Sequence, residues 1–398
     1  MKFLLGLMLG SLLILLNSCK PIDKLAQQTS KRQYVTEEWM LGPFEKRNDV
    51  NPILSALDST EFLCPIRGTK VKWEEKDVFN PAAIVKDGNV YILYRAEDNI
   101  GTYAGTSRIG LAVSTDGVHF KRHPLPVLYP DNDSLKVYEW EGGCEDPRII
   151  EGENGVYYLY YTVFNGEIAR LCVASSTDLY HWNKHGMVFG KVNNGELKDY
   201  WSKSGSVITS LQNGRLKAAK VNGKYWMYFG ESEVFIATSD NLIDWVPLER
   251  SEQMVKKLKY LGNSKWQVSL PETRKSFRTA ITTRQGRFDS GLVEPGPPAL
   301  LTDKGILFIY NGANSGKNGD NTIPANAYCG GQVLFDATDP TCVINRCKES
   351  FFLPDSGSET LGQVNNVCFL ESLVYFNNTW ILYYGMADSK VGMAVCKK

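Results

Sequence analysis

Charged residues inside apolar, strand-like segments are the first candidates for chemistry in this sequence. The motif Glu-Asp-Pro-Arg at 145–148 interrupts one such segment, and Arg95 and Asp98 end another. A buried charge without a partner is costly, so these side chains are expected to be paired or functional. Carboxylates held among arginines and aromatic groups suit a general acid at a glycosidic oxygen, and Asp146 is the candidate. The alternative is an ion pair between Asp146 and Arg148 that only stabilises the fold.

An internal repeat positions these residues. Five segments share a turn, an aromatic-rich stretch and a polar end, and their first residues lie 67 to 82 positions apart. The five segments cover residues 88–98, 155–165, 223–233, 305–314 and 378–388. Each copy has a short apolar segment before it and another after it. Short β-branched and aromatic runs, with turns such as Asp-Gly and Asn-Gly between them, predict β-hairpins rather than helices.

The repeat predicts an all-β fold, a five-bladed β-propeller over residues 46–398. A unit of roughly 65 to 80 residues is larger than the simplest propeller repeat but fits an elaborated blade. A β-sandwich or a two-domain chain is the alternative. Residues 250–290 interrupt the period and are expected to form a long excursion between the third and fourth blades.

The predicted fold brings distant polar residues together. The first strand of each propeller blade lines a central channel, so the segments that begin the five blades should converge. These segments carry Asn80, Asp146, Ser204, Glu294 and Glu371. Polar groups that converge from distant positions form a small-molecule site, in which Glu294 and Glu371 are expected to contact the substrate.

Composition narrows the class of ligand. The chain has 398 residues, with 44 Lys plus Arg and 44 Asp plus Glu, so its formal net charge is zero. This balance argues against nucleic-acid binding, which requires a basic face. Aromatic residues make up 12% of the chain, which favours β-rich structure and surfaces that stack on sugar rings. No Cys/His motif has metal-ligand spacing, so neither a metal nor another cofactor is expected.

The N-terminus has the pattern of an export signal. Residues 1–18 combine a short basic start with an apolar stretch that is too short to span a bilayer comfortably. The stretch ends before Cys19, as in bacterial lipoprotein signals, so Cys19 is the expected lipid-modified residue. Residues 19–45 are expected to form a tether and N-terminal segment. We therefore expect an exported protein, lipid-anchored to the bacterial envelope and most plausibly to the outer membrane. An ordinary secretory signal with a chance cysteine is the alternative.

The repeated segments resemble glycoside hydrolase family 130 in order and spacing, from about residue 70 to the C-terminus. The segments that carry this resemblance are residues 80–98, 107–117, 138–149, 169–182, 223–231, 296–312 and 380–395. The resemblance implies a five-bladed fold and action on β-mannosides. Family members are implied to be mostly inverting phosphorylases, with a smaller branch of hydrolases that act on β-1,2-linked mannose.

The resemblance also implies roles for individual residues. Asp146 matches the general acid of the family, whose proton is thought to pass through a hydroxyl of the bound mannose. Asp388 matches a family position that we expect to contact the sugar. The positions expected near the sugar at the cleavage site are Asn80, Arg95, Asp98 and Arg108.

Hydrolysis and phosphorolysis differ in what lies opposite the acid. A phosphorylase requires basic groups for phosphate, and Arg170, Lys203 and Lys220 are candidates. Glu167 and Glu231 lie where phosphate would otherwise bind, and either could activate water as a general base. We therefore expect an inverting exo-β-1,2-mannosidase that releases mannose from manno-oligosaccharides. The alternatives are a β-mannoside phosphorylase that uses inorganic phosphate to form mannose 1-phosphate, a non-catalytic sugar-binding propeller, and a glycosidase acting on arabinan or xylan.

Overall fold

The computed structural model describes residues 36–103, 105–250 and 277–397. The described residues all belong to one compact unit, residues 34–398. The predicted signal peptide, Cys19 and most of the predicted excursion lie outside the described residues. Helix is confined to α2 (Lys136–Glu139), α4 (Gly357–Thr360) and a 3-10 turn (Val192–Gly195) within the described ranges. The prediction of an all-β fold is confirmed.

The first two antiparallel sheets follow the predicted repeat. The first contains β5 (Asp77–Lys86), β6 (Asn89–Glu97), β7 (Ser107–Ser114) and β8 (Lys121–Arg122). The second contains β9 (Gly143–Glu151), β10 (Tyr157–Phe164), β11 (Ala169–Ser176) and β12 (Asn183–Met187). The hairpin β3 (Phe62–Cys64) and β4 (Thr69–Val71) precedes them. The repeated aromatic segments form the second strand of each sheet, β6 and β10.

Three further groups of strands continue the same order. The third contains β13 (Ser206–Gln212), β14 (Arg215–Ala218), β15 (Lys220–Val221), β16 (Lys224–Phe229), β17 (Val234–Ser239), β18 (Trp245–Pro247) and β19 (Thr279–Ile281). The fourth contains β20 (Leu292–Pro295), β21 (Ala299–Thr302), β22 (Gly305–Ala313), β23 (Tyr328–Phe335) and β24 (Val343–Arg346). The last contains β25 (Cys368–Phe376), β26 (Thr379–Met386) and β27 (Lys390–Lys397), with β1 (Glu45–Lys46) and β2 (Leu54–Ser55) paired to β27.

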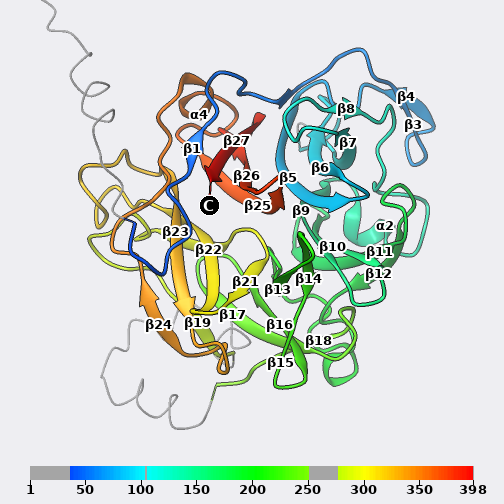
Figure 1. The fold of residues 1–398 in the computed structure, drawn as a ribbon. Helices are drawn as coiled ribbons and strands as arrows, with labels where there is room; N and C mark the ends of the chain where they lie inside the picture. The colour runs from blue at the N-terminus through cyan, green and yellow to red at the C-terminus, as the bar shows by residue number, and fades with distance from the viewer. Residues whose placement is uncertain (1–35, 104, 251–276, 398) are drawn as a thin grey trace, which may run out of the picture. The chain divides into compact units, whose positions relative to one another are not determined.

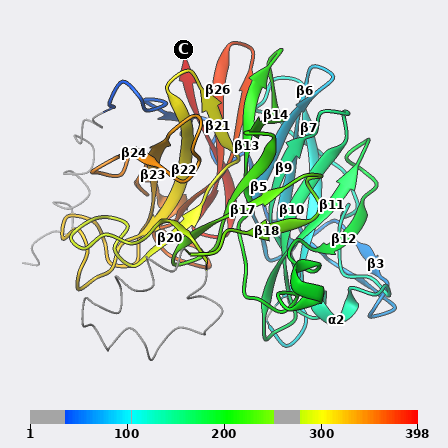
Figure 2. The same ribbon diagram turned by 90° about the horizontal axis from the view of Figure 1, so that it is seen from below.

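The first strands of the groups lie next to one another (Figure 1). Strand β5 contacts both β9 and β25, and β13 pairs in parallel with β21. Figure 2 shows β5, β9 and β13 side by side, with β22 and β23 on one side of them and β10 and β11 on the other. This arrangement brings together the residues that begin each group.

Apolar side chains fill the spaces between successive sheets. One buried cluster joins the first and second sheets through Leu93 and Leu159, and another joins the second and third through Val173 and Met227. Further clusters join the third to the fourth and the fourth to the last. A fifth joins the last sheet back to the first, with Tyr383 packed in the same cluster as residues of β5 and β6. Each sheet therefore buries both of its faces against neighbours.

Irregularities in the first strands redirect polar side chains. The pairing register shifts at Asn80 in β5, around Asp146 in β9 and at Glu371 in β25. Asn80 and Asp146 adopt φ values of 47° and 46°, a left-handed conformation that Asn and Asp tolerate better than most residues. A β-bulge bends the strand and re-aims a side chain. These bulges turn Asn80 and Asp146 toward each other.

Candidate active site

Asp146 lies at the centre of a buried polar cluster. Its Oδ1 accepts hydrogen bonds from Asn80 Nδ2 at 2.9 Å and from an Arg95 guanidinium nitrogen at 3.0 Å. Only 4% of Asp146 is exposed. Both contacts involve the same carboxylate oxygen, so Oδ2 is the oxygen available to a ligand.

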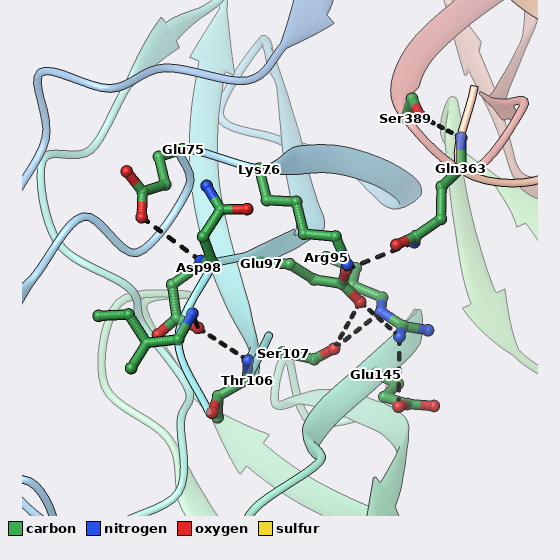
Figure 3. Close-up of polar contacts among 12 residues, drawn as sticks. Glu75, Lys76, Arg95, Glu97, Asp98, Thr106, Ser107, Glu145, Gln363 and Ser389 are labelled. Carbon is green, nitrogen blue, oxygen red and sulfur yellow. Dashed lines mark hydrogen bonds and ion pairs between the residues drawn. The ribbon is translucent and has the colours of Figure 1, made fainter. Parts of the chain in front are cut away.

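Arg95 connects three carboxylates from two sheets, and Figure 3 draws two of them, Glu97 and Glu145. Besides Asp146, it donates to Glu97 Oε1 at 2.7 Å and to Glu145 Oε1 at 3.2 Å. Its Nε donates to the Ser107 hydroxyl at 2.9 Å. Figure 3 shows these groups gathered around the guanidinium, which fixes the orientation of every carboxylate that it contacts.

The charges around Asp146 determine its protonation. Burial alone would raise the pKa of Asp146, but the cations of Arg95, Lys203 and Arg148 outweigh it and hold the pKa well below its usual range. Burial dominates at the adjacent Glu145 and raises its pKa despite Arg95. In the free protein Asp146 is therefore a carboxylate, so it must gain a proton after substrate enters in order to act as an acid.

Lys203 lies among carboxylates on the other side of the cluster. Its Nζ is 3.9 Å from Glu231 Oε1, and its charge also acts on Glu294 and Asp146. Burial would lower the pKa of Lys203, but the attraction of these carboxylates raises it, so the ammonium stays charged. The Ser204 hydroxyl donates to Glu294 Oε1, and the Trp201 indole N–H donates to Glu231 Oε2 at 3.1 Å.

Two carboxyl groups in this region titrate near neutral pH. Burial raises the pKa of Glu294 to about 7, against the opposing charge of Lys203. Burial, helped by the negative charge of Asp146, raises the pKa of Asp388 to about 7. Asp388 lies in the turn between β26 and β27, half-buried, with φ of 50°. The region therefore holds protonated carboxyls next to an ionised one.

Three of the expected site residues, Asp98, Arg108 and Glu371, form buried ion pairs. Arg108 lies 2.8 Å from Asp98, whose other oxygen accepts the Thr106 backbone N–H, as Figure 3 shows in part. This pair holds the loop between β6 and β7 beside the cluster. Arg148 lies 2.8 Å from Glu371 and donates to main-chain carbonyls of β20 and its following turn, and neither side chain is exposed. The structure therefore places Glu371 beneath the Asp146 cluster, away from solvent.

Three expected residues lie apart from the central cluster. Glu167 is exposed in the turn between β10 and β11, and its carboxylate has no contact within the described part of the chain. Arg170 is held by two contacts to Asp199, at 2.9 and 3.0 Å. Lys220 lies 3.8 Å from Glu153. Glu153 is in the turn that follows β9, at the opposite end of that strand from Asp146. The structure thus separates Lys220 from the acid, because the short strands β14 and β15 carry it to the opposite end of the sheets.

Sequence reasoning missed Tyr328, and it placed neither Glu97 nor Glu145 among the site residues. Burial raises the pKa of Tyr328, and the charges of Glu294, Glu231 and Lys203 also act on it. The Glu-Asp-Pro-Arg motif could have indicated Glu145, since it adjoins Asp146. No comparable signal marks Tyr328, which reaches the cluster from the fourth sheet.

The described residues contain no group of three or more His, Cys, Asp or Glu side chains arranged to hold a metal ion. Cys342 and Cys347 are both free thiols. Over the same ranges no helix has the length and apolar character needed to cross a bilayer.

Comparisons with known proteins bear on this geometry. The sequence model of glycoside hydrolase family 130, described as beta-1,4-mannooligosaccharide phosphorylase, matches residues 44–398. The curated 1,2-beta-oligomannan phosphorylase of Thermoanaerobacter sp. (strain X514) is 32% identical over 332 residues, covering 81% of this chain and 91% of that protein.

Solved structures match with higher identity. A putative glycoside hydrolase from Bacteroides ovatus ATCC 8483 is 47% identical with a TM-score of 0.81, covering 91% of this chain and 98% of that one. Another is described as "The GH130 family of mannoside phosphorylases contains glycoside hydrolases that target beta-1,2 mannosidic linkages in Candida mannan". It is 45% identical with a TM-score of 0.83, covering 91% of this chain and 96% of that one.

Proposed function

Because this chain belongs to glycoside hydrolase family 130, we propose that it cleaves β-1,2-mannosidic bonds of manno-oligosaccharides by hydrolysis. It is an enzyme of the glycoside hydrolase and phosphorylase type, as the sequence predicted. The names of the curated relative and of one solved structure both specify a β-1,2 linkage, which supports this linkage. The observation that carries the proposal is the buried contact of Asp146 with Asn80 and Arg95.

We further propose that the sheets form the five blades of a β-propeller. The cycle of apolar clusters, in which the last sheet packs against the first, supports this arrangement. Pairing of β1 with β27 supports it as well, because a strand from the start of the unit completes the last sheet. In this arrangement the Asp146 cluster lies at one end of the central channel.

Asp146 is the proposed general acid. Its carboxylate is ionised in the free protein, while Glu294 and Asp388 hold protons near neutral pH. A sugar hydroxyl that binds at Asp146 Oδ2 would take the place of water there. Asp146 would then take a proton from Asp388 and pass it through that hydroxyl to the glycosidic oxygen. Asn80 and Arg95 orient the carboxylate for this transfer.

The charge around Asp146 supports water as the attacking group. Lys203 is surrounded by Glu231, Glu294 and Asp146, so its positive charge is already balanced. Phosphate carries negative charge and would be repelled by this group of carboxylates. Glu231, held by Trp201 and Lys203, is the proposed base that removes a proton from water.

Phosphorolysis is the second candidate, and the curated relatives favour it over the hydrolysis expected first from the sequence. The 1,2-beta-oligomannan phosphorylase and a beta-1,2-mannobiose phosphorylase of the same organism, 29% identical to this chain, are both phosphorylases. Arg170 and Lys203 would be the phosphate-binding residues. Arg170 would have to break its contact with Asp199 in order to bind phosphate.

A linkage panel tests the proposed specificity. Purified protein is incubated with β-1,2-, β-1,3- and β-1,4-mannobiose in phosphate-free buffer, and released mannose is quantified. Mannose release from the β-1,2 isomer at least tenfold faster than from the others is expected. Equal or faster cleavage of the β-1,4 isomer would overturn the linkage assignment.

We also propose that the chain is exported and lipid-anchored at Cys19. Support comes from the apolar stretch before Cys19 and the polar residues that follow it. Metabolic labelling with a palmitate analogue in a bacterial host should label the wild-type chain and not the Cys19→Ala variant. Equal labelling of both would contradict the assignment.

A further inference from the structure

A second hollow lies at the opposite end of the sheets from Asp146. Its volume is about 650 Å³, within the range of small-molecule pockets. Three turns from three sheets surround it, those between β5 and β6, β13 and β14, and β25 and β26. The residues that give it chemical character are Asp87, Asn213, Arg215, Tyr375, Asn377 and Asn378.

An apolar layer separates this hollow from the Asp146 cluster. Ala83, Ile149 and Leu373 are among the residues around a space of only about 10 Å³, which holds no more than one water molecule. The buried Arg148–Glu371 pair lies beside this layer in sequence, one residue from Ile149 and two from Leu373. A ligand in the hollow therefore cannot reach Asp146, so the hollow is not an extension of the proposed active site.

The lining suits an uncharged, hydroxyl-rich ligand. The amide groups of Asn213, Asn377 and Asn378 make no hydrogen bond to any residue that the structure describes, and each offers donors and an acceptor. Arg215 and Asp87 carry opposite charges, so the lining has no excess charge that would select an anion or a cation.

Turn chemistry explains only part of this lining. Asp87, Asn213, Asn377 and Asn378 all have positive φ, which hairpin turns require and Asn and Asp tolerate. A turn does not require the half-buried ring of Tyr375, which packs on Trp380 with ring centroids 5.1 Å apart, or the guanidinium of Arg215, which lies 3.2 Å from Glu151. An aromatic ring beside amides and a guanidinium is the combination that binds a sugar, because the ring packs on its C–H face while the polar groups bind its hydroxyls.

We propose that this hollow is a second, non-catalytic binding site for a neutral oligosaccharide. The existence of the site does not depend on the reaction at Asp146. The choice of a manno-oligosaccharide as its ligand rests on the proposed function. A second site would keep the enzyme on a polymeric substrate while the Asp146 cluster acts on chain ends.

Binding stoichiometry tests the proposal. β-1,2-mannotriose is titrated by calorimetry into the Asp146→Asn variant, which prevents turnover, and two sites per chain are expected. Adding Tyr375→Ala or Arg215→Ala should remove one site. Arg215 and Lys217 both contact the buried carboxylate of Glu151. Arg215→Ala leaves Lys217 in place, 3.1 Å from Glu151, so a loss of binding in this variant does not come from an unpaired buried carboxylate. Tyr180→Ala, an exposed aromatic elsewhere, is the matched control and should keep both sites.

Activity separates this proposal from the proposed function. Tyr375→Ala, in an otherwise wild-type chain, should cleave β-1,2-mannobiose within twofold of wild type and polymeric β-1,2-mannan several-fold more slowly. If both hollow variants keep the stoichiometry and affinity of their parent, the second site is refuted. If wild type cleaves no mannobiose, the proposed function fails, while the binding result still decides the second site.

Discussion

Asp146 combines two properties that usually oppose each other. It is almost fully buried, which disfavours the charged form, yet Arg95, Lys203 and Arg148 keep it ionised. At Glu294 and Asp388, burial and like charge outweigh the cations and raise the pKa of each carboxyl group to about 7. The cluster thus holds acids and bases of different strength within one site, as proton-transfer chemistry requires.

Replacing the acid should abolish catalysis with little effect on folding. Asp146→Asn keeps the side-chain shape and the contact with Asn80 but cannot carry the proton, so kcat should fall by about 10²–10⁴. Steady-state kinetics on β-1,2-mannobiose measure this loss. Asp240→Asn, at an exposed carboxylate paired with Lys224, should retain wild-type kcat. Comparable rates for both variants would contradict the role of Asp146.

Glu231 can be distinguished from a merely structural carboxylate by chemical rescue. Glu231→Gln keeps the hydrogen-bond acceptor for Trp201 and removes the base, so water attack should slow by at least about 100-fold. Azide needs no base and should restore turnover with formation of an α-mannosyl azide, detected by NMR. Loss of activity without azide rescue would count against Glu231.

The raised pKa of Asp388 implies a pH-dependent cost in stability. In the folded chain Asp388 keeps its proton up to about pH 7, whereas in the unfolded chain it loses the proton near its usual pKa of 3.8. Stability from this group is therefore present at low pH and lost as pH rises through 7. The free energy of unfolding of Asp388→Asn, relative to that of wild type, should be about 2 kcal/mol higher at pH 8 than at pH 5. Urea unfolding at both pH values measures this; equal gains would contradict the shift.

At the scale of elements, the repeated turns made the long strands predictable from the sequence, whereas the short connecting strands could not be predicted. Asp87-Gly88 and the equivalent turns require positive φ, so the hairpins that they close could be located from sequence alone. Strands β14 and β15 have no such repeat, which is why Lys220 was expected near the acid and lies elsewhere. Asn80, Arg95 and Asp146 were expected together because each ends or begins a repeated strand. Tyr328 was missed because its approach depends on packing between sheets.

The close approach of neighbouring sheets beside the acid can be tested at one glycine. Gly143 begins β9 with φ of 110°, and a Cβ there would meet the Ser107 backbone oxygen at 2.2 Å. Gly143→Ala should therefore lower the free energy of unfolding by more than about 2 kcal/mol. Gly155→Ala also has positive φ but meets no atom within 4 Å, so it should cost only about 1 kcal/mol. Equal losses in thermal unfolding would show that this approach is not tight.

At the scale of the whole molecule, the two ends of the sheets have different chemistry. One end gathers the carboxylates and cations around Asp146, and the other carries amides, an aromatic ring and the opposite charges of Asp87 and Arg215 around the second hollow. The equal numbers of basic and acidic residues, 44 of each, do not indicate this difference between the two ends. The whole chain is neutral, while carboxyl groups of Glu231, Glu294 and Asp146 surround Lys203, and the proposal of water as the attacking group rests on this local charge.

The most direct measurement is the product formed from β-1,2-mannobiose with and without inorganic phosphate. NMR follows the products of wild type and of Asp146→Asn in both buffers. Hydrolysis predicts free mannose as the product in both buffers, at rates that phosphate does not increase, and at least about 100-fold slower release from Asp146→Asn. Turnover only with phosphate, giving mannose 1-phosphate, would contradict hydrolysis, and intact disaccharide in both buffers would contradict the proposed function as a whole.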